Sequence, residues 1–206
     1  MSLEPDPGER PDLSDPLVVN ALAMDEFDRR VHQIGAEQWG NTTPCTDWDV
    51  RALVNHVVYE LRWVPPLMDG RTVAEIGDAF EGDQLGDDPK AAWDTATVAA
   101  RGAVEEPDAL LRTVHLSYGD VPARHYLTEL SGDLAIHAWD LAKGIDAEER
   151  LDPDLAQFLY DWTLPHAEAL SGSGAYAPPK TVSDEAPVQD RLLGLTGRDP
   201  SWAPGT

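Results

Sequence analysis

Hydrophobic residues recur at helical spacing along most of the chain. Apolar side chains fall three or four positions apart, which places them on one face of a helix, and no stretch alternates between apolar and polar residues as a half-exposed strand does. Five segments fit this pattern, over residues 16–34, 47–64, 89–106, 122–143 and 153–170. Long helices without strands predict an all-α fold, a four-helix bundle with a short extra C-terminal helix or tail.

Capping residues and prolines predict where these helices begin and end. Thr46, with Asp49 three residues later, approximates a capping box at the start of the second helix. The pair Pro65-Pro66 is expected to stop that helix. Pro122 suits the first turn of the fourth helix, and Gly144 is expected to close it. Between the third and fourth helices, the stretch LLRTVHLSYGDVP is predicted to be a loop or a short extended piece.

The periodic segments form one predicted domain. A chain of 206 residues is long enough for one well-packed core with room for a tail. Residues 1–15 are acidic and proline-rich and are expected to be a flexible segment, while residues 16–206 form a single helical-bundle domain. Within that domain, residues 172–206 are expected to be mostly loop, with one short helix in QDRLLGLTGRDP.

Charge and composition narrow the partners and the compartment. A formal net charge of −23 would repel nucleic acid and anionic membranes, so neither is expected as a partner. No apolar run approaches the ~20 residues that a membrane span needs. The N-terminus lacks the basic start and apolar core of a signal peptide, and the single cysteine, Cys45, excludes an internal disulfide framework. A cytoplasmic protein is therefore expected.

The fourth helix carries polar residues where its buried face should be apolar. Its hydrophobic seam runs through four leucines at heptad spacing, and His137 falls on that seam. Asp133 lies four residues earlier and therefore about 40° around the helix, on the same inward-facing surface. A carboxylate and an imidazole buried without partners would each cost several kcal/mol, so something must satisfy them. The leucines are Leu127, Leu130, Leu134 and Leu141.

His56 on the second helix is the natural third member of this group. It lies one residue off an apolar stripe and would reach across the bundle core. Two ligands four residues apart on one helix and one ligand on a facing helix would hold a divalent metal and leave positions open for water or substrate. The spacing thus predicts a metal site at His56, Asp133 and His137. A plainer interpretation stays open, because a histidine near an apolar face is more often a hydrogen-bonded core residue, and Asp133 with His137 could be an intrahelical pair.

Other titratable side chains are weaker candidates. His32 and His166 lie in polar helical surroundings, His125 lies one turn into the fourth helix, and His115 lies in the predicted loop. Cys45 directly precedes the second helix, whose N-terminus could lower the pKa of a thiol, but no paired base is evident nearby. The helix tryptophans are expected to be core or pocket wall: Trp48, Trp63 and Trp139.

Two sequence motifs together resemble a known family. TPCTDWDVRALVNHVV, at residues 43–58, and GDLAIHAWDLAKG, at residues 132–144, are similar to motifs of the mycothiol-dependent maleylpyruvate isomerase-like branch of the DinB/YfiT metalloenzymes. The resemblance covers most of the chain and implies a DinB-like four-helix bundle with a divalent metal, zinc or nickel, between its helices. It implies that His56 is the first ligand and that Asp133 and His137 are the second and third.

The sequence departs from the isomerase in two respects. The isomerase pattern has a glutamate where this chain has Asp133, which is one methylene shorter, so the geometry of the site must shift. The isomerase also carries a C-terminal domain that helps to build its active site, and this chain is expected to lack it. The resemblance thus implies a metal-binding scaffold for thiol chemistry more firmly than it implies one named reaction.

The leading hypothesis is a zinc-dependent enzyme, with nickel as the alternative metal. It would transfer mycothiol to a small electrophilic substrate or use mycothiol to isomerise that substrate. Asp140 or Glu60 would orient a ligand imidazole. Two alternatives stay open: a metal-dependent hydrolase on the same site, and a bundle that binds metal or a small molecule without turnover. Whether the bundle forms a homodimer also stays open.

Overall fold

Helices make up most of the protein, and the predicted all-α bundle is confirmed. The computed structural model describes residues 11–173 and 176–204. Residues 1–10, most of the N-terminal segment expected to be flexible, lie outside the described residues, and residues 11–15 lead through a turn into the first helix. The helices are α1 (Pro16–Val31), α2 (Val50–Met68), α3 (Val73–Ile76), α4 (Pro89–Val104), α5 (Ala123–Ile145), α6 (Pro153–Thr163), α7 (Ala167–Ser173) and α8 (Val188–Leu195).

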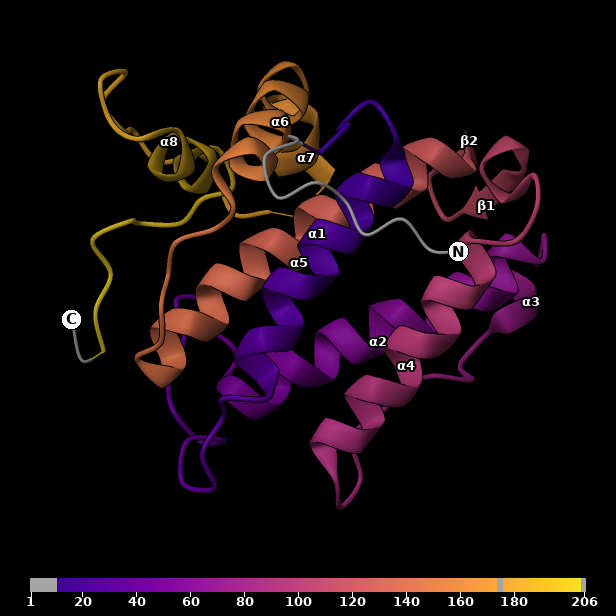
Figure 1. Cartoon of the computed structure of the whole chain (residues 1–206), viewed down its shortest axis with the longest axis horizontal. Helices are drawn as coiled ribbons and strands as arrows, with labels where there is room; N and C mark the ends of the chain where they lie inside the picture. Colours follow the sequence, from indigo (N-terminus) through magenta and orange to yellow (C-terminus); the bar gives the residue numbers. More distant parts are fainter. Residues whose placement is uncertain (1–10, 174–175, 205–206) are drawn as a thin grey trace, which may run out of the picture.

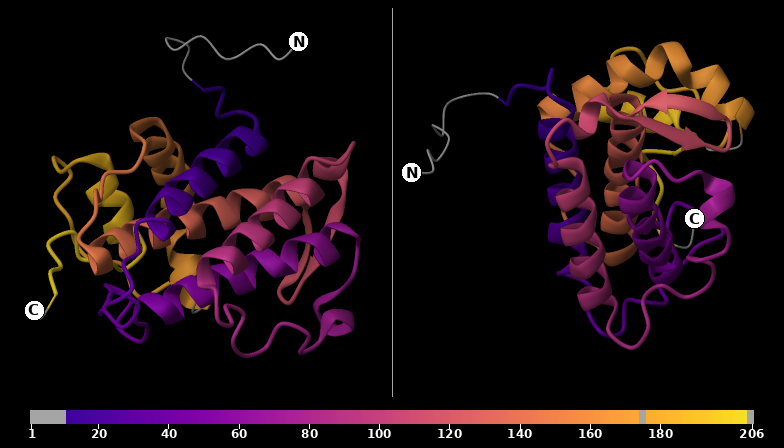
Figure 2. Two further views of the ribbon diagram at one scale, coloured as in Figure 1. Left: turned by 60° about the horizontal axis from the view of Figure 1, so that its bottom comes forward. Right: turned by 90° about the vertical axis from the view of Figure 1, so that its right-hand side faces the viewer.

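The bundle is built around α5, most of whose residues are buried. Helix α1 packs along α5, α4 packs along α2, and α2 also contacts α5 (Figure 1). Helices α6 and α8 pack against each other beside this four-helix core (Figure 2). Helix α6 also contacts α1, which joins the pair to the core. The short C-terminal helix that the sequence predicted is α8. In the described part of the chain, no helix is both long and apolar enough to cross a bilayer.

Aspartate side chains begin four of the long helices. Asp15, Asp49 and Asp88 each accept a hydrogen bond from a backbone N–H two or three residues later, and Asp152 accepts two. A capping carboxylate of this kind stabilises a helix by about 1 kcal/mol. The expected cap at Thr46 is therefore wrong by three residues: Asp49 Oδ1 receives the Ala52 N–H at 2.8 Å. Because Asp49 fixes the start of α2, it also fixes which residues of α2 face α5.

Helix α2 continues through the proline pair that was expected to stop it. Pro65 and Pro66 lie inside the helix, which ends only at Met68. Prolines remove two backbone donors there, but the last turn carries Leu67 and Met68 into the core, where they are 1% and 2% exposed. Burial of these side chains offsets the lost hydrogen bonds.

Helix α5 also runs past its expected end. Gly144 lies within the helix, and the left-handed residue that ends it is Asp146, with φ 56°. Gly144 has a packing reason instead: a Cβ atom there would lie 2.9 Å from Val50 Cγ2 and 3.1 Å from Thr43 Cγ2. The glycine lets α5 approach the first residue of α2 closely.

Of the two remaining segments, one agrees with an alternative that the sequence predicted and the other differs from its prediction. The stretch between α4 and α5 forms an antiparallel hairpin of β1 (Thr113–Leu116) and β2 (Gly119–Pro122), which agrees with the extended alternative. The predicted fifth helix is divided, because a 3₁₀ turn at Leu164–His166, which contains Pro165, separates α6 from α7.

Candidate metal site

Helices α2 and α5 bring the three predicted ligands together. Asp133 Oδ2 lies 3.4 Å from His56 Nε2, and Asp133 Oδ1 lies 3.4 Å from His137 Nε2. One nitrogen or oxygen atom from each residue lies within 4.8 Å of the others. His56 comes from the middle of α2, while Asp133 and His137 lie one turn apart on α5. The contact between these two helices therefore places the group.

The group fits a divalent metal. Asp133 Oδ2 is buried and has no hydrogen-bond partner among the described residues, although a buried carboxylate oxygen normally has one. Two imidazole nitrogens and a carboxylate oxygen form the three-ligand set that zinc accepts with a fourth position open. A cation between the three side chains would give Asp133 Oδ2 the strong contact that a hydrogen bond does not supply.

Electrostatics tie the three side chains together. Burial by itself lowers the pKa of His137, but the carboxylates of Asp133 and Asp140 raise it to about 9. Burial likewise raises the pKa of Asp133, but the two imidazoles hold it well below its ordinary value. In the absence of a metal, His137 is therefore a cation paired with Asp133 at neutral pH. Metal binding through Nε2 of His137 would have to displace the proton on that nitrogen.

Asp140 orients one of the candidate ligands, His137. Its Oδ2 atom accepts a hydrogen bond from His137 Nδ1 at 2.9 Å, which keeps the Nδ1 proton in place and turns Nε2 toward Asp133. Asp140 is fully buried, and Arg198 Nη2 donates to the same oxygen at 2.9 Å. Of the two carboxylates considered for this role, Asp140 makes the hydrogen bond. Glu60 is close enough to feel the charge of Asp133, and burial together with this charge raises the pKa of Glu60 to about 7.

Trp48 covers the site from the loop before α2. Its ring stacks on His56, with ring centroids 4.5 Å apart, and lies 5.6 Å from the ring of His137. The two imidazoles meet edge to face at 5.0 Å. Trp48 therefore acts as pocket wall, as the sequence suggested, and shields one side of both imidazoles from water.

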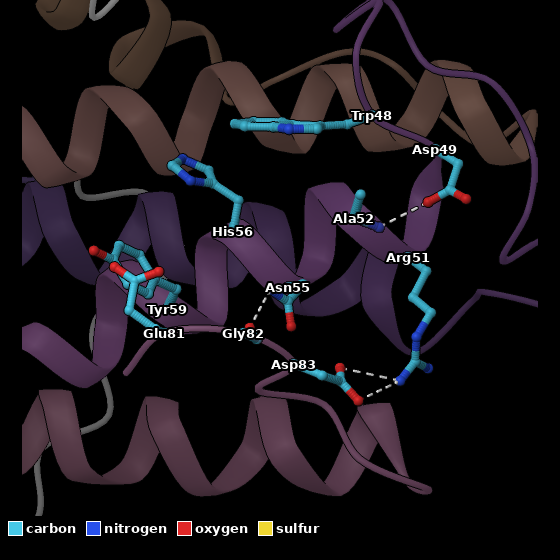
Figure 3. Close-up of a pocket in the computed structure, with 10 residues that line it drawn as sticks. All are labelled: Trp48, Asp49, Arg51, Ala52, Asn55, His56, Tyr59, Glu81, Gly82 and Asp83. Carbon is cyan, nitrogen blue, oxygen red and sulfur yellow. Dashed lines mark hydrogen bonds and ion pairs between the residues drawn. The ribbon is translucent and has the colours of Figure 1, made fainter. Parts of the chain in front are cut away.

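A pocket of about 530 Å³ opens beside His56 (Figure 3). Trp48 and His56 line one part of it, and Tyr59 and Glu81 lie near His56 in the close-up. Residues 81–83 form another part of the lining, and hydrogen bonds from α2 hold this segment in place. Asn55 bonds the Gly82 carbonyl at 3.2 Å and the backbone N–H of residue 84 at 2.7 Å. The candidate metal site thus lies next to a space of substrate size.

The remaining histidines lie apart from this group in the described structure. His32 contacts Asp28 and Asp94 on an exposed surface, and His115 bonds Asp120 across the hairpin. His125 pairs with Glu129, and His166 bonds the Trp162 carbonyl. These contacts give each of the four a local structural partner.

The idea of an activated Cys45 is wrong. Burial, and then the charge of Asp140, raises the pKa of this thiol to about 11, so it stays protonated near neutral pH.

The site includes a residue that the sequence did not indicate, Arg198. It lies beyond α8 and far along the chain from α5, and no spacing rule connects it to His137.

Fold and site together define a helical-bundle protein with an imidazole–carboxylate group between two helices. The chain belongs to the mycothiol maleylpyruvate isomerase N-terminal domain family, whose sequence profile matches residues 21–142. This finding confirms the family resemblance of the two motifs. The matched segment covers α2, α4 and most of α5, and hence all three candidate ligands, but not Arg198.

Individual relatives support the assignment. Uncharacterized proteins from two strains of Mycobacterium tuberculosis are each 31% identical to this chain over 190 residues, which is 89% of this chain and 98% of theirs. Crystal structures of a mycothiol-dependent maleylpyruvate isomerase and of a single-residue mutant of that enzyme share the fold. Their TM-scores are 0.56 and 0.57, with 21% and 20% identity over 74% of this chain and 72% of theirs.

Proposed function

We propose that this protein is a metal-dependent enzyme that acts on a small electrophile with a low-molecular-weight thiol, mycothiol. It either transfers the thiol to the electrophile or uses the thiol to isomerise it. The observation that carries the proposal is the group of three ligand atoms within 4.8 Å of one another, which includes a buried carboxylate oxygen without a hydrogen bond and borders an open pocket. Membership of a family described by a mycothiol enzyme supports the choice of thiol.

Each residue of the site has a part in this proposal. His56 Nε2, His137 Nε2 and the Asp133 carboxylate would hold a divalent ion, with zinc favoured by the nitrogen-rich set and nickel as the alternative. The bound ion would supply a Lewis-acid centre that lowers the pKa of a thiol. Asp140 keeps a proton on Nδ1 of His137, and Trp48 excludes water from one side of the imidazoles.

The pocket indicates which charge the electrophile carries. Arg51, the basic side chain of its lining, is already paired with a carboxylate: its Nη2 atom contacts both Asp83 oxygens at 3.1 and 3.2 Å and the Gly86 carbonyl at 2.9 Å. Glu81 adds another carboxylate to the lining. An anionic ligand would meet negative potential without an unpaired arginine or lysine among the lining residues of the described structure. We infer that the electrophile is uncharged or cationic.

Metal analysis of the purified protein tests the site. We expect about one zinc or nickel ion per chain after exposure to either metal, and loss of the bound ion in His56→Ala and His137→Ala. Wild-type protein that takes up no metal under metal-replete conditions would contradict the ligand set.

Thermal stability and turnover with thiols test the chemistry. Mycothiol should raise the melting temperature of the metal-loaded protein because it binds the folded state, and glutathione should raise it less. Turnover of an electrophile in the absence of any thiol would point to a hydrolase and exclude thiol transfer.

A further inference from the structure

We propose that Arg198, three residues beyond the end of α8, is a positioning residue for the metal site. It acts through Asp140 on His137 and so couples the docking of the C-terminal segment to metal affinity. The inference rests on the proposed function for the metal itself. Arg198 itself lies outside residues 21–142, the segment that the family profile matches.

A continuous chain of contacts joins the three side chains. Arg198 Nη2 donates to Asp140 Oδ2 at 2.9 Å, and its Nε lies 3.4 Å from the other oxygen, so the guanidinium faces both oxygens of the carboxylate. The same Oδ2 atom accepts the hydrogen bond from His137 Nδ1 at 2.9 Å. Arg198 is 9% exposed and Asp140 is fully buried, so water cannot readily replace either partner.

The guanidinium fixes the plane of the Asp140 carboxylate. An aspartate side chain can rotate about its terminal bond, and a single hydrogen bond to an imidazole leaves that rotation weakly restrained. Two guanidinium contacts on its two oxygens restrain it. His137 then keeps one ring orientation, with Nε2 toward Asp133 and His56. Loss of Arg198 would leave both the carboxylate and the imidazole free to turn.

The backbone at the end of α8 delivers Arg198 to this place. The Arg198 N–H bonds the Leu193 carbonyl at 2.9 Å and the Gly197 N–H bonds the Gly194 carbonyl at 3.1 Å, which is the pattern of a Schellman motif. Gly197 has the left-handed φ of 79° that this motif requires. A Cβ atom on Gly197 would lie 2.6 Å from Ala177 Cβ and 2.7 Å from the Ala177 carbonyl oxygen.

Further contacts hold the guanidinium once it is in place. Arg198 Nη1 donates to the Thr196 carbonyl at 2.8 Å, and the guanidinium carbon lies 5.6 Å from the centre of the Tyr176 ring. Cys45 Sγ, at 4.0 Å from Nη2, closes the other side. The C-terminal segment therefore does more than cover the bundle: it inserts one cation behind a metal ligand.

Metal affinity in a set of variants tests the coupling. Arg198→Met removes the guanidinium, and Arg198→Lys keeps the positive charge but loses the two-pronged guanidinium. Gly197→Ala deletes no site side chain but disturbs the backbone motif that carries Arg198. Arg30→Met is the matched control, because Arg30 is 1% exposed and pairs with Glu26 and with carbonyl groups of residues 148 and 150, none of them in the site. Affinity is measured by competition with a chromophoric chelator.

We expect about a 10- to 100-fold weaker zinc affinity for Arg198→Met and for Gly197→Ala, the usual cost of losing a partner of a ligand. Arg198→Lys should lie between these variants and wild type. Arg30→Met should bind zinc like wild type although its melting temperature falls. Should Arg198→Met not fold, Gly197→Ala and Arg198→Lys carry the same comparison. Unchanged affinity in the folded Arg198 and Gly197 variants would overturn the proposal.

A measurement on the metal-free protein separates this inference from the proposed function. The Nδ1 proton of His137 should give a resolved NMR signal that exchanges slowly with water in wild type and in Arg30→Met, and fast in Arg198→Met and Gly197→Ala. Persistence of the slow signal in those two variants would overturn the positioning role even if zinc binds. A different outcome is that wild-type protein binds no metal but the slow signal is present in wild type and lost in the two variants. That outcome would overturn the metal function and support the positioning of His137 by Arg198.

Discussion

The imidazoles of His56 and His137 meet edge to face, with ring centroids 5.0 Å apart, although they belong to different helices. Asp133 lies against both, with one carboxylate oxygen 3.4 Å from each Nε2 atom. Two rings and a carboxylate therefore converge where a hydrophobic bundle would place aliphatic side chains. This convergence leads to predictions about metal affinity, stability and the exposure of the site to water.

Zinc affinity should rise with pH. Only a neutral imidazole can ligate, and His137 has a pKa of about 9 in the metal-free protein. Between pH 6.5 and pH 9 the apparent affinity should therefore increase by about tenfold per pH unit, and it should level off above the pKa. Chelator competition across this range measures the slope. A flat profile below pH 8 would contradict the ion pair of His137 with Asp133.

The same pKa predicts the stability of the metal-free protein. Because the folded pKa of His137 lies above the ordinary value of 6.5, its protonation stabilises the fold fully below pH 6.5. This contribution should be lost as the pH rises from 6.5 through 9. Zinc-loaded protein should lack this loss, because His137 is already deprotonated. Urea unfolding of both forms at several pH values measures the difference.

Removal of the Trp48 ring should loosen the site. Trp48→Ala exposes one side of both imidazoles, so bound zinc should be extracted faster by a chelator. Ring pairs of this kind contribute about 0.5–1.5 kcal/mol, which corresponds to roughly a 2- to 12-fold change in the extraction rate. Trp48→Phe keeps an aromatic cover and should lie near wild type. Equal rates for the alanine and phenylalanine variants would show that the stacking is unimportant.

The charge of the pocket should set substrate preference. We expect 4-chloro-3,5-dinitrobenzamide to react with mycothiol on the enzyme faster than the matching benzoate, as measured by kcat/KM. The thiol sulfur bonds to the ring carbon, chloride leaves, and the thiol proton is released. Asp83→Asn frees Arg51 and should narrow the preference by about 3- to 10-fold.

An acidic residue outside the pocket is the control for this comparison. Glu185 is exposed on the loop before α8, so Glu185→Gln removes the same amount of charge without touching the lining. It should leave the ratio of the two rates unchanged. An equal shift of this ratio in Asp83→Asn and Glu185→Gln would indicate a general effect of net charge. A wild-type preference for the benzoate would contradict the inference that the electrophile is uncharged or cationic.

Two glycine substitutions should have opposite effects on stability. Gly144→Ala places a methyl group 2.9 Å from Val50 Cγ2 where α5 meets α2, and should destabilise the protein by about 1–3 kcal/mol. Gly102→Ala, at an exposed position of α4 with no atom within 4 Å of the added Cβ, should stabilise it by about 0.5–1 kcal/mol. Denaturant unfolding of both variants measures the difference. A stabilising Gly144→Ala would show that the helix contact tolerates separation.

Local pattern predicted most of the fold. The apolar spacing located α1, α2, α4 and α5, because the 3.6-residue period of a buried helix face is written into the order of residues. Helix ends were less accurate. Thr46, Pro65-Pro66 and Gly144 all carry the local signal of a helix boundary, yet the helices begin or end elsewhere. The local cap of Asp49 decided the start of α2. Tertiary packing decided the other two positions, because Leu67 and Met68 enter the core beyond the prolines and Gly144 faces Val50.

For the candidate site, the sequence by itself determined the polar residues that interrupt the apolar faces. His137 and Asp133 share one face of α5 because four residues make about one turn. Only the tertiary structure decided that His56 reaches them, that Trp48 covers the two rings, and that Arg198 lies behind Asp140. The spacing of a helix relates residues within one helix, whereas these contacts depend on how α2, α5 and the segment after α8 pack together.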